Sequence, residues 1–168
     1  MLEKFVQELF IFDITPIQIY LLWFLLGSFT VATLSDLKHL SAQREFLHVW
    51  ILFVIAAFSV DFYHGYFLNE GIKFYLFLKW FLILIFFPLY FHYFCHIAWG
   101  DIFAKMAACS LFPPLLVIVF IILIRLTDFF TGFLWRRLGR GNLYPFMPVV
   151  FLVTLVLTIV FVFLAKSL

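Results

Sequence analysis

The chain has 168 residues, of which 67% are hydrophobic and only 12% are charged. Soluble domains are about half apolar and about a quarter charged. This composition therefore excludes a water-soluble enzyme, a DNA-binding domain and a secreted disulfide scaffold. With 27 phenylalanines and a mean hydropathy of +1.17, the sequence indicates an integral membrane protein. The formal net charge of +2 is too small to indicate a nucleic-acid partner.

The first residues, 1–13, do not resemble a cleaved signal peptide. Acidic residues surround the single basic residue, Lys4, whereas a signal peptide begins with a positive stretch that leads directly into an apolar one. Apolar residues recur here at helical spacing: Leu2, Phe5, Val6, Leu9 and Phe10. This pattern is typical of a short helix in the membrane interface, and a frayed chain end fits it equally well.

Six charge-poor segments follow, and each is a candidate for a membrane-spanning helix. A helix needs roughly 20 apolar residues to cross a bilayer. The predicted spans are 14–35, 46–60, 72–93, 100–112, 115–131 and 144–165. We therefore expect an all-α integral membrane protein, a bundle of about six transmembrane helices that forms one domain over 1–168 with a core of about 14–166.

Two of these spans have special features. The third contains Lys73 and Lys79 near its start, where long side chains can extend outward to the membrane surface. The fourth is barely long enough to cross alone, and it ends at Pro113-Pro114, a pair that breaks or kinks a helix.

The basic residues of the loops predict the orientation in the membrane. Those after the first and fifth spans are Lys38, Arg44, Arg136, Arg137 and Arg140, whereas the opposite side has only Lys4, Lys73 and Lys166. Basic loops favour the cytoplasmic side, so both termini should lie outside. We expect a multi-pass protein of the plasma or inner membrane.

Placing a carboxylate at membrane depth costs free energy, so each such residue requires a structural or functional explanation. Four aspartates lie near the ends of spans: Asp36, Asp61, Asp101 and Asp128. Asp128 follows Arg125 by one helical turn, which favours a local ion pair. In the predicted topology Asp61 lies on the outer side. Asp36 and Asp101 both lie on the cytoplasmic side, at matching levels of two different helices.

Two carboxylates brought together at a membrane surface cannot both stay charged cheaply. One keeps a proton at neutral pH, so that one acts as a general acid while the other acts as a base. Such a pair can take a proton from water, direct that water at a peptide carbonyl and protonate the leaving amine. It needs no metal and no covalent intermediate. By spacing alone, however, two ordinary aspartates at span ends explain the pattern as well.

Short motifs around these aspartates occur in a fixed order. They are Ser35-Asp36-Leu37-Lys38-His39, Ala98-Trp99-Gly100-Asp101 and, at the start of the last span, Pro145-Phe146-Met147-Pro148. This ordered set, which covers about residues 18–163, resembles the type IV prepilin peptidase family, the membrane aspartic proteases with a GxGD motif. Ala98 replaces the first glycine of that motif. Phe103 stands where a basic residue usually follows the second aspartate.

The resemblance implies that Asp36 and Asp101 are the catalytic pair. The residues that shape the site or bind substrate would be Gly100, Lys38 and Pro145. A glycine beside the second aspartate lets the substrate backbone approach closely. The implied partner is a prepilin-like or preflagellin-like precursor, whose leader peptide is cut at the cytoplasmic membrane boundary. No cofactor is implied. The chain has no paired CxxC motifs, so the resemblance implies a minimal peptidase without methyltransferase activity.

Two other interpretations remain open. A catalytically silent scaffold, such as an assembly factor of a pilus system, would keep the same fold. The altered GxGD motif favours it, and the presence of both aspartates argues against it. A small transporter or channel would instead use the intramembrane charges Asp61, Lys79, Arg125 and Asp128 as its pathway.

A metal site is the weakest candidate. His92 and His96 lie one helical turn apart before Asp101, a spacing that metal ligands use. No third ligand stands at a suitable spacing, although Cys95 is close in sequence. Interfacial histidines, or residues that tune Asp101, explain the pair better, so we predict no metal.

Overall fold

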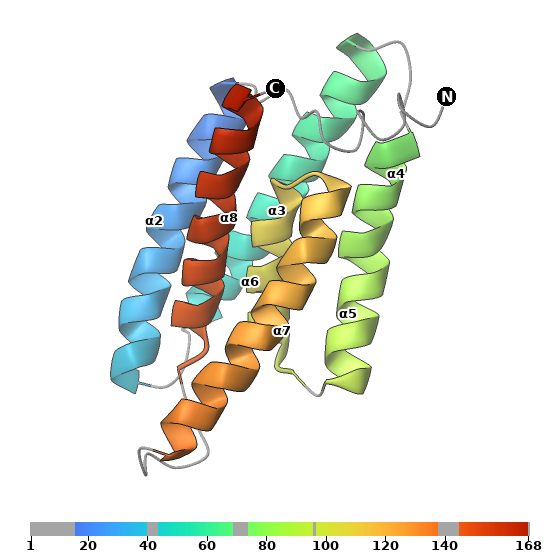
Figure 1. The fold of residues 1–168 in the computed structure, drawn as a ribbon. Coiled ribbons are helices and arrows are strands. Elements are labelled where there is room, and N and C mark those ends of the chain that lie inside the picture. The colour runs from blue at the N-terminus through green and yellow to red at the C-terminus, as the bar shows by residue number, and fades with distance from the viewer. Residues whose placement is uncertain (1–15, 40–43, 69–73, 96, 138–144, 168) are drawn as a thin grey trace.

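The computed structural model describes residues 16–39, 44–68, 74–95, 97–137 and 145–167, and all regular structure in this part of the chain is helical. The elements are α2 (Pro16–His39), α3 (Arg44–Tyr63), η1 (His64–Leu68), α4 (Phe74–Phe81), η2 (Leu82–Phe86), α5 (Phe87–Leu89), η3 (Tyr90–Phe94), α6 (Trp99–Ser110), α7 (Pro114–Arg137) and α8 (Met147–Ser167). The η elements are π-helical turns: η1 continues α3, η2 joins α4 to α5, and η3 continues α5. Six helical segments thus form the described part of the bundle in Figure 1. The predicted all-α fold is confirmed.

Four of the six segments are long and apolar enough to cross a membrane. They are Ile17–Lys38, Phe46–Tyr66, Phe74–Phe94 and Pro114–Arg137, and they correspond to the first, second, third and fifth predicted spans. In α8 the described apolar stretch is shorter, Met147–Val160. The predicted interfacial helix over 1–13 lies outside the described residues.

The outer surface of the bundle is apolar. Tyr20 is 75% exposed and Trp23 is 71% exposed, and both belong to a span that carries no charge before Asp36. Soluble proteins rarely expose large continuous apolar surfaces to water. In a bilayer such side chains face lipid, so this surface indicates a membrane-embedded protein.

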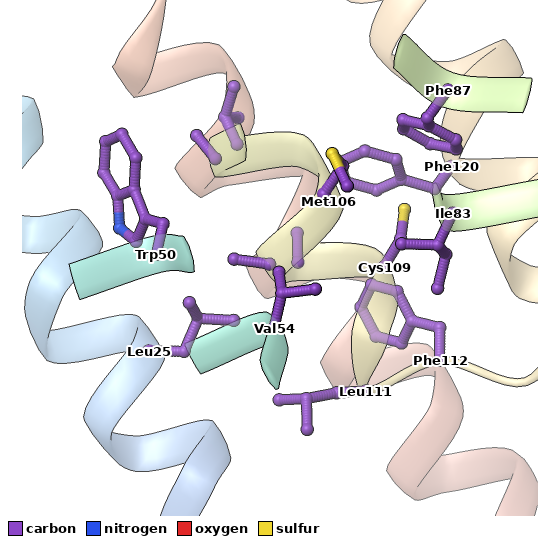
Figure 2. Packing of buried hydrophobic residues seen from close by; sticks show 14 of the residues in the cluster. Leu25, Trp50, Val54, Ile83, Phe87, Met106, Cys109, Leu111, Phe112 and Phe120 are labelled. Atoms are coloured by element: carbon purple, nitrogen blue, oxygen red, sulfur yellow. The ribbon is translucent and has the colours of Figure 1, made fainter. Parts of the chain in front are cut away.

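The helix α6 lies at the centre of the bundle. Every residue from Ala104 to Ser110 is buried, and α6 contacts α3, α7, α8 and the third helical segment. Figure 2 shows its Met106 and Cys109 among the buried side chains of neighbouring helices. Small residues on α6, such as Ala107, allow neighbouring backbones to approach closely.

The length of α6 explains why it was the weakest predicted span. Its 12 residues extend about 18 Å at about 1.5 Å per residue, less than the roughly 30 Å of a hydrocarbon core. The helix ends at Ser110, two residues before the predicted end of the span, and Pro113-Pro114 follow. There the Phe112 N–H donates to the Cys109 carbonyl at 3.0 Å, and Pro114 begins α7.

The alternating directions of the helices determine which residues lie at each end of the bundle. The end of α2 and the starts of α6 and α8 lie toward the lower end in Figure 1, whereas the end of α3 and the start of α4 lie at the upper end. Asp36 and Asp101 therefore share one end, and Asp61 lies toward the other, as the order of the predicted spans requires.

Candidate functional site

Asp36 joins the first described helix to the last. It lies one turn before the end of α2, its side chain is buried at 6% exposure, and its Oδ2 accepts a hydrogen bond of 2.9 Å from the backbone N–H of Met147. Met147 is the first residue of α8. The carboxylate therefore ties the end of α2 to the start of α8.

The sequence at the start of α8 explains this contact. The first N–H groups of a helix have no partner inside it. Here the N–H groups of Val149 and Val150 both donate to the Phe146 carbonyl, and the residue between Met147 and Val149 is a proline, which has no N–H. The Met147 N–H is thus the donor that remains, and Asp36 accepts it. A carboxylate at this position also interacts favourably with the helix dipole.

Asp101 lies in the first turn of α6 and is partly buried. The chain enters this helix from Ala98, which is extended, with a φ of −62° and a ψ of 145°. A Cβ on Gly100 would meet no neighbouring atom within 4 Å. Packing within the protein therefore does not require a glycine here, and open space adjoins the residue before Asp101.

The two predicted catalytic residues lie at the same end of the bundle. The carboxylates of Asp36 and Asp101 are close enough for their charges to interact. Of the residues predicted to shape the site, Lys38 is exposed at the end of α2 and Pro145 is buried directly before α8. The catalytic role of the pair stays a prediction.

Lys105 is the residue that the sequence analysis missed. It lies on α6 one turn after Asp101, with 1% of its surface exposed. Its Nζ is 4.4 Å from the ring centre of Phe91 and 4.3 Å from that of Phe146, and its charge interacts with Asp101 and Asp128. The available signal was its spacing of four residues from Asp101 on one helix.

A second charged pair borders this cluster. Arg125 and Asp128 approach to 3.9 Å between Nη1 and Oδ2, so the predicted local ion pair is confirmed. Arg125 also donates a hydrogen bond to the sulfur of Cys95 and lies 5.6 Å from the ring centres of Tyr90 and Phe91. The guanidinium group therefore links α7 to the end of the third helical segment.

The prediction that Lys79 extends outward to the membrane surface is wrong. Its side chain is fully buried, and its Nζ donates to Asp61 Oδ2 at 2.6 Å. The indole Nε1 of Trp80 donates to the same oxygen at 3.1 Å. Lys79 turns inward because α3 presents a buried carboxylate that compensates its charge.

Of the histidine pair, the structure describes only His92. The ring of His92 stacks on Trp99 with 4.5 Å between centroids, and His96 lies outside the described residues. In the part of the chain that the structure describes, no group of three His, Cys, Asp or Glu side chains is placed to hold a metal ion.

Comparison of the chain with models of protein families, with curated proteins and with solved structures finds no match. The fold and the site therefore assign the protein to the general class of membrane-embedded helical bundles. At one end of this bundle lie Asp36, from α2, and Asp101, which shares α6 with the buried Lys105.

Proposed function

We propose that this protein is a membrane aspartic endopeptidase that cleaves the leader peptide of prepilin-like or preflagellin-like precursors at the cytoplasmic membrane boundary. The observation that carries the proposal is that Asp36 and Asp101 lie at the same end of the bundle. The two residues are distant in sequence and lie on different helices, yet their charges interact at one end of the bundle. The resemblance of their surrounding motifs to the prepilin peptidases supplies the substrate class.

The chemistry follows from two carboxylates at the same end of the bundle. With a single proton on the pair, the ionised member accepts a proton from a water molecule as that water attacks the scissile carbonyl. The protonated member then donates its proton to the amine that leaves. Each turnover returns one proton to the pair, so no metal ion and no covalent intermediate is required.

The position of the pair suits a substrate that is itself a membrane helix. The carbonyls of a transmembrane helix are already hydrogen-bonded, so a peptidase must bind the chain where the helix has ended. Prepilins carry a short basic leader before an apolar helix. Asp36, near the end of α2, and Asp101, in the first turn of α6, are level with such a junction if this end faces the cytoplasm. The exposed Arg136 and Arg137, at the end of α7, favour that orientation.

One observation favours the alternative of a catalytically silent scaffold. The hydrogen bond from Met147 gives Asp36 a structural task, because it completes the first turn of α8. A protein that had lost activity would therefore still need this carboxylate. Asp101 has no comparable hydrogen bond among the described residues. Asp101→Asn therefore distinguishes a peptidase from a silent scaffold better than Asp36→Asn does.

The test is cleavage of a precursor in membranes. The chain is co-expressed with tagged prepilin-like and preflagellin-like precursors, and the mature product is followed by its faster migration on a gel. Wild type should cleave at least one precursor, whereas Asp36→Asn and Asp101→Asn should not, although both accumulate in the membrane. A matched control is the double variant Asp61→Asn with Lys79→Met, which removes a carboxylate at the opposite end and should still cleave. Cleavage by either site variant would contradict the proposal.

A further inference from the structure

We propose that Lys105 is a positioning residue of this site, whose buried ammonium group is the counter-ion of Asp101. This inference rests on the proposed function for its kinetic test, and its structural test is independent of that function. No motif of the resemblance includes a basic residue at position 105. The placement of the side chain in the structure carries the inference.

The burial of Lys105 is the first observation. A long lysine side chain near a membrane surface ordinarily carries its charge to water. Lys105 is 1% exposed, so its ammonium group stays inside the bundle. A charge in such a place must be compensated by nearby groups. Because burying the Lys105 ammonium group costs desolvation free energy, we interpret its position as functional.

The contacts of the ammonium group fix its position. The rings of Phe91, on η3, and Phe146, directly before α8, lie 4.4 and 4.3 Å from Nζ, which is within cation–π range. Phe146 also accepts the backbone bonds that start α8, next to the Met147 N–H that Asp36 accepts. Lys105 and Asp36 therefore both interact with the start of α8.

The charged and titratable groups that act on Lys105 come from three parts of the chain. Its own helix supplies Asp101, α7 supplies Asp128 and Arg125, and the chain after η3 supplies Cys95. Among the described residues, no carboxylate oxygen lies within 4.0 Å of its Nζ. The ammonium group therefore acts through its charge at a distance rather than in a direct ion pair with one carboxylate.

The balance of charges gives Lys105 its role. Arg125 pairs with Asp128 at 3.9 Å, so these two charges offset each other. The charge of Lys105 then acts mainly on Asp101, one turn away on the same helix. A positive charge beside a partly buried carboxylate favours its ionised form. Lys105 therefore helps Asp101 to be ionised, as a general base must be.

The kinetic test compares Lys105→Met with Lys105→Arg in the cleavage assay as a function of pH. Methionine keeps the apolar stem between the two rings and removes the charge, so Asp101 loses the positive charge that favours its ionised form. We expect cleavage at pH 7 to fall about tenfold and the acidic limb of the pH profile to move about one unit upward, with KM unchanged. Arginine should restore most of the rate and the wild-type profile. An unshifted profile in Lys105→Met, or an equal shift in Lys105→Arg, would overturn the inference.

The structural test is a double-mutant cycle that needs no activity. Unfolding temperatures in detergent are measured for Lys105→Met, Asp101→Asn and the double variant, with Lys105→Gln as a replacement if the methionine variant does not fold. We expect the unfolding temperature of the double variant to fall by less than the sum of the two single decreases, because each single change leaves its partner uncompensated. Asp61 lies far from the cluster, so the decreases in unfolding temperature caused by Asp61→Asn and by Lys105→Met should be additive. Additive losses for Lys105 and Asp101 would overturn the inference.

The two tests separate failure of the inference from failure of the proposed function. If wild type cleaves no precursor, the peptidase proposal fails, and coupling in the unfolding cycle still supports Lys105 as counter-ion of Asp101. If wild type cleaves and Lys105→Met cleaves equally well with the same pH profile, the peptidase proposal stands and the role of Lys105 is refuted.

Discussion

The carboxylate of Asp36 accepts a hydrogen bond of 2.9 Å from the backbone N–H of Met147, across 111 residues of sequence. This contact ties the first described helix to the last at the end of the bundle where Asp101 also lies. The geometry of the candidate site therefore depends on the start of α8. The same carboxylate both completes a helix and belongs to the proposed catalytic pair.

Substitutions of Asp36 should separate these two tasks. The side-chain oxygen of asparagine can accept the Met147 N–H, so Asp36→Asn should keep the free energy of unfolding within about 0.5 kcal/mol of wild type. Asp36→Ala removes the acceptor and should cost about 1 kcal/mol, the usual effect of losing a helix cap. Reversible unfolding in detergent measures both values. Equal stability of the alanine and asparagine variants would show that the hydrogen bond contributes nothing.

The buried pair of Asp61 and Lys79 predicts a strong asymmetry between single and double changes. Lys79→Met leaves the Asp61 carboxylate buried without its counter-charge and should cost about 3 kcal/mol. Adding Asp61→Asn removes the uncompensated charge and keeps an acceptor for the Trp80 indole, so the double variant should recover most of the loss. Denaturation in detergent measures the three variants. A double variant as unstable as the sum of the singles would contradict this account.

The central position of α6 predicts sensitivity to larger side chains. Ala107 is fully buried, so Ala107→Leu forces additional volume into a packed core and should cost about 1–3 kcal/mol or prevent folding. Val31 is 57% exposed on α2, and Val31→Leu is the matched control that should be neutral. Yield of folded protein in detergent, followed by thermal unfolding, compares them. Equal tolerance at both positions would mean that α6 is not tightly packed.

The orientation in the membrane can be measured with single cysteines. Arg136 and Tyr66 are exposed at opposite ends of the bundle, and a Cys95→Ser background leaves only the fully buried Cys109. An impermeant maleimide applied to intact cells should label Tyr66→Cys, whereas Arg136→Cys should be labelled only in inverted vesicles. The reverse pattern would place the Asp36–Asp101 end outside and contradict cleavage at the cytoplasmic boundary.

Much of the fold follows from one-dimensional patterns. Charge-poor runs of helical length predict the six segments, and Pro113-Pro114 predicts the turn between α6 and α7. The shared end of Asp36 and Asp101 follows from the number of segments between them. The ion pair of Arg125 and Asp128 is equally local, because residues three apart on a helix are neighbours.

The contacts that the sequence analysis missed depend on partners from other segments. The inward direction of Lys79 depends on a carboxylate that α3 supplies, and a single helix pattern does not reveal such a partner. The bond from Met147 to Asp36 likewise depends on how α2 meets α8. Lys105 was passed over because its ring partners, Phe91 and Phe146, come from two other segments.

The most direct test of the central claim uses purified protein. Wild type, Asp101→Asn and the Asp61→Asn/Lys79→Met control are reconstituted in lipid vesicles with a purified precursor, and the products are identified by mass spectrometry. The account predicts that wild type and the control cut one peptide bond between the leader and the apolar helix, and that Asp101→Asn, equally folded, cuts none. Cleavage of the same bond by Asp101→Asn would contradict an aspartic mechanism that depends on this pair.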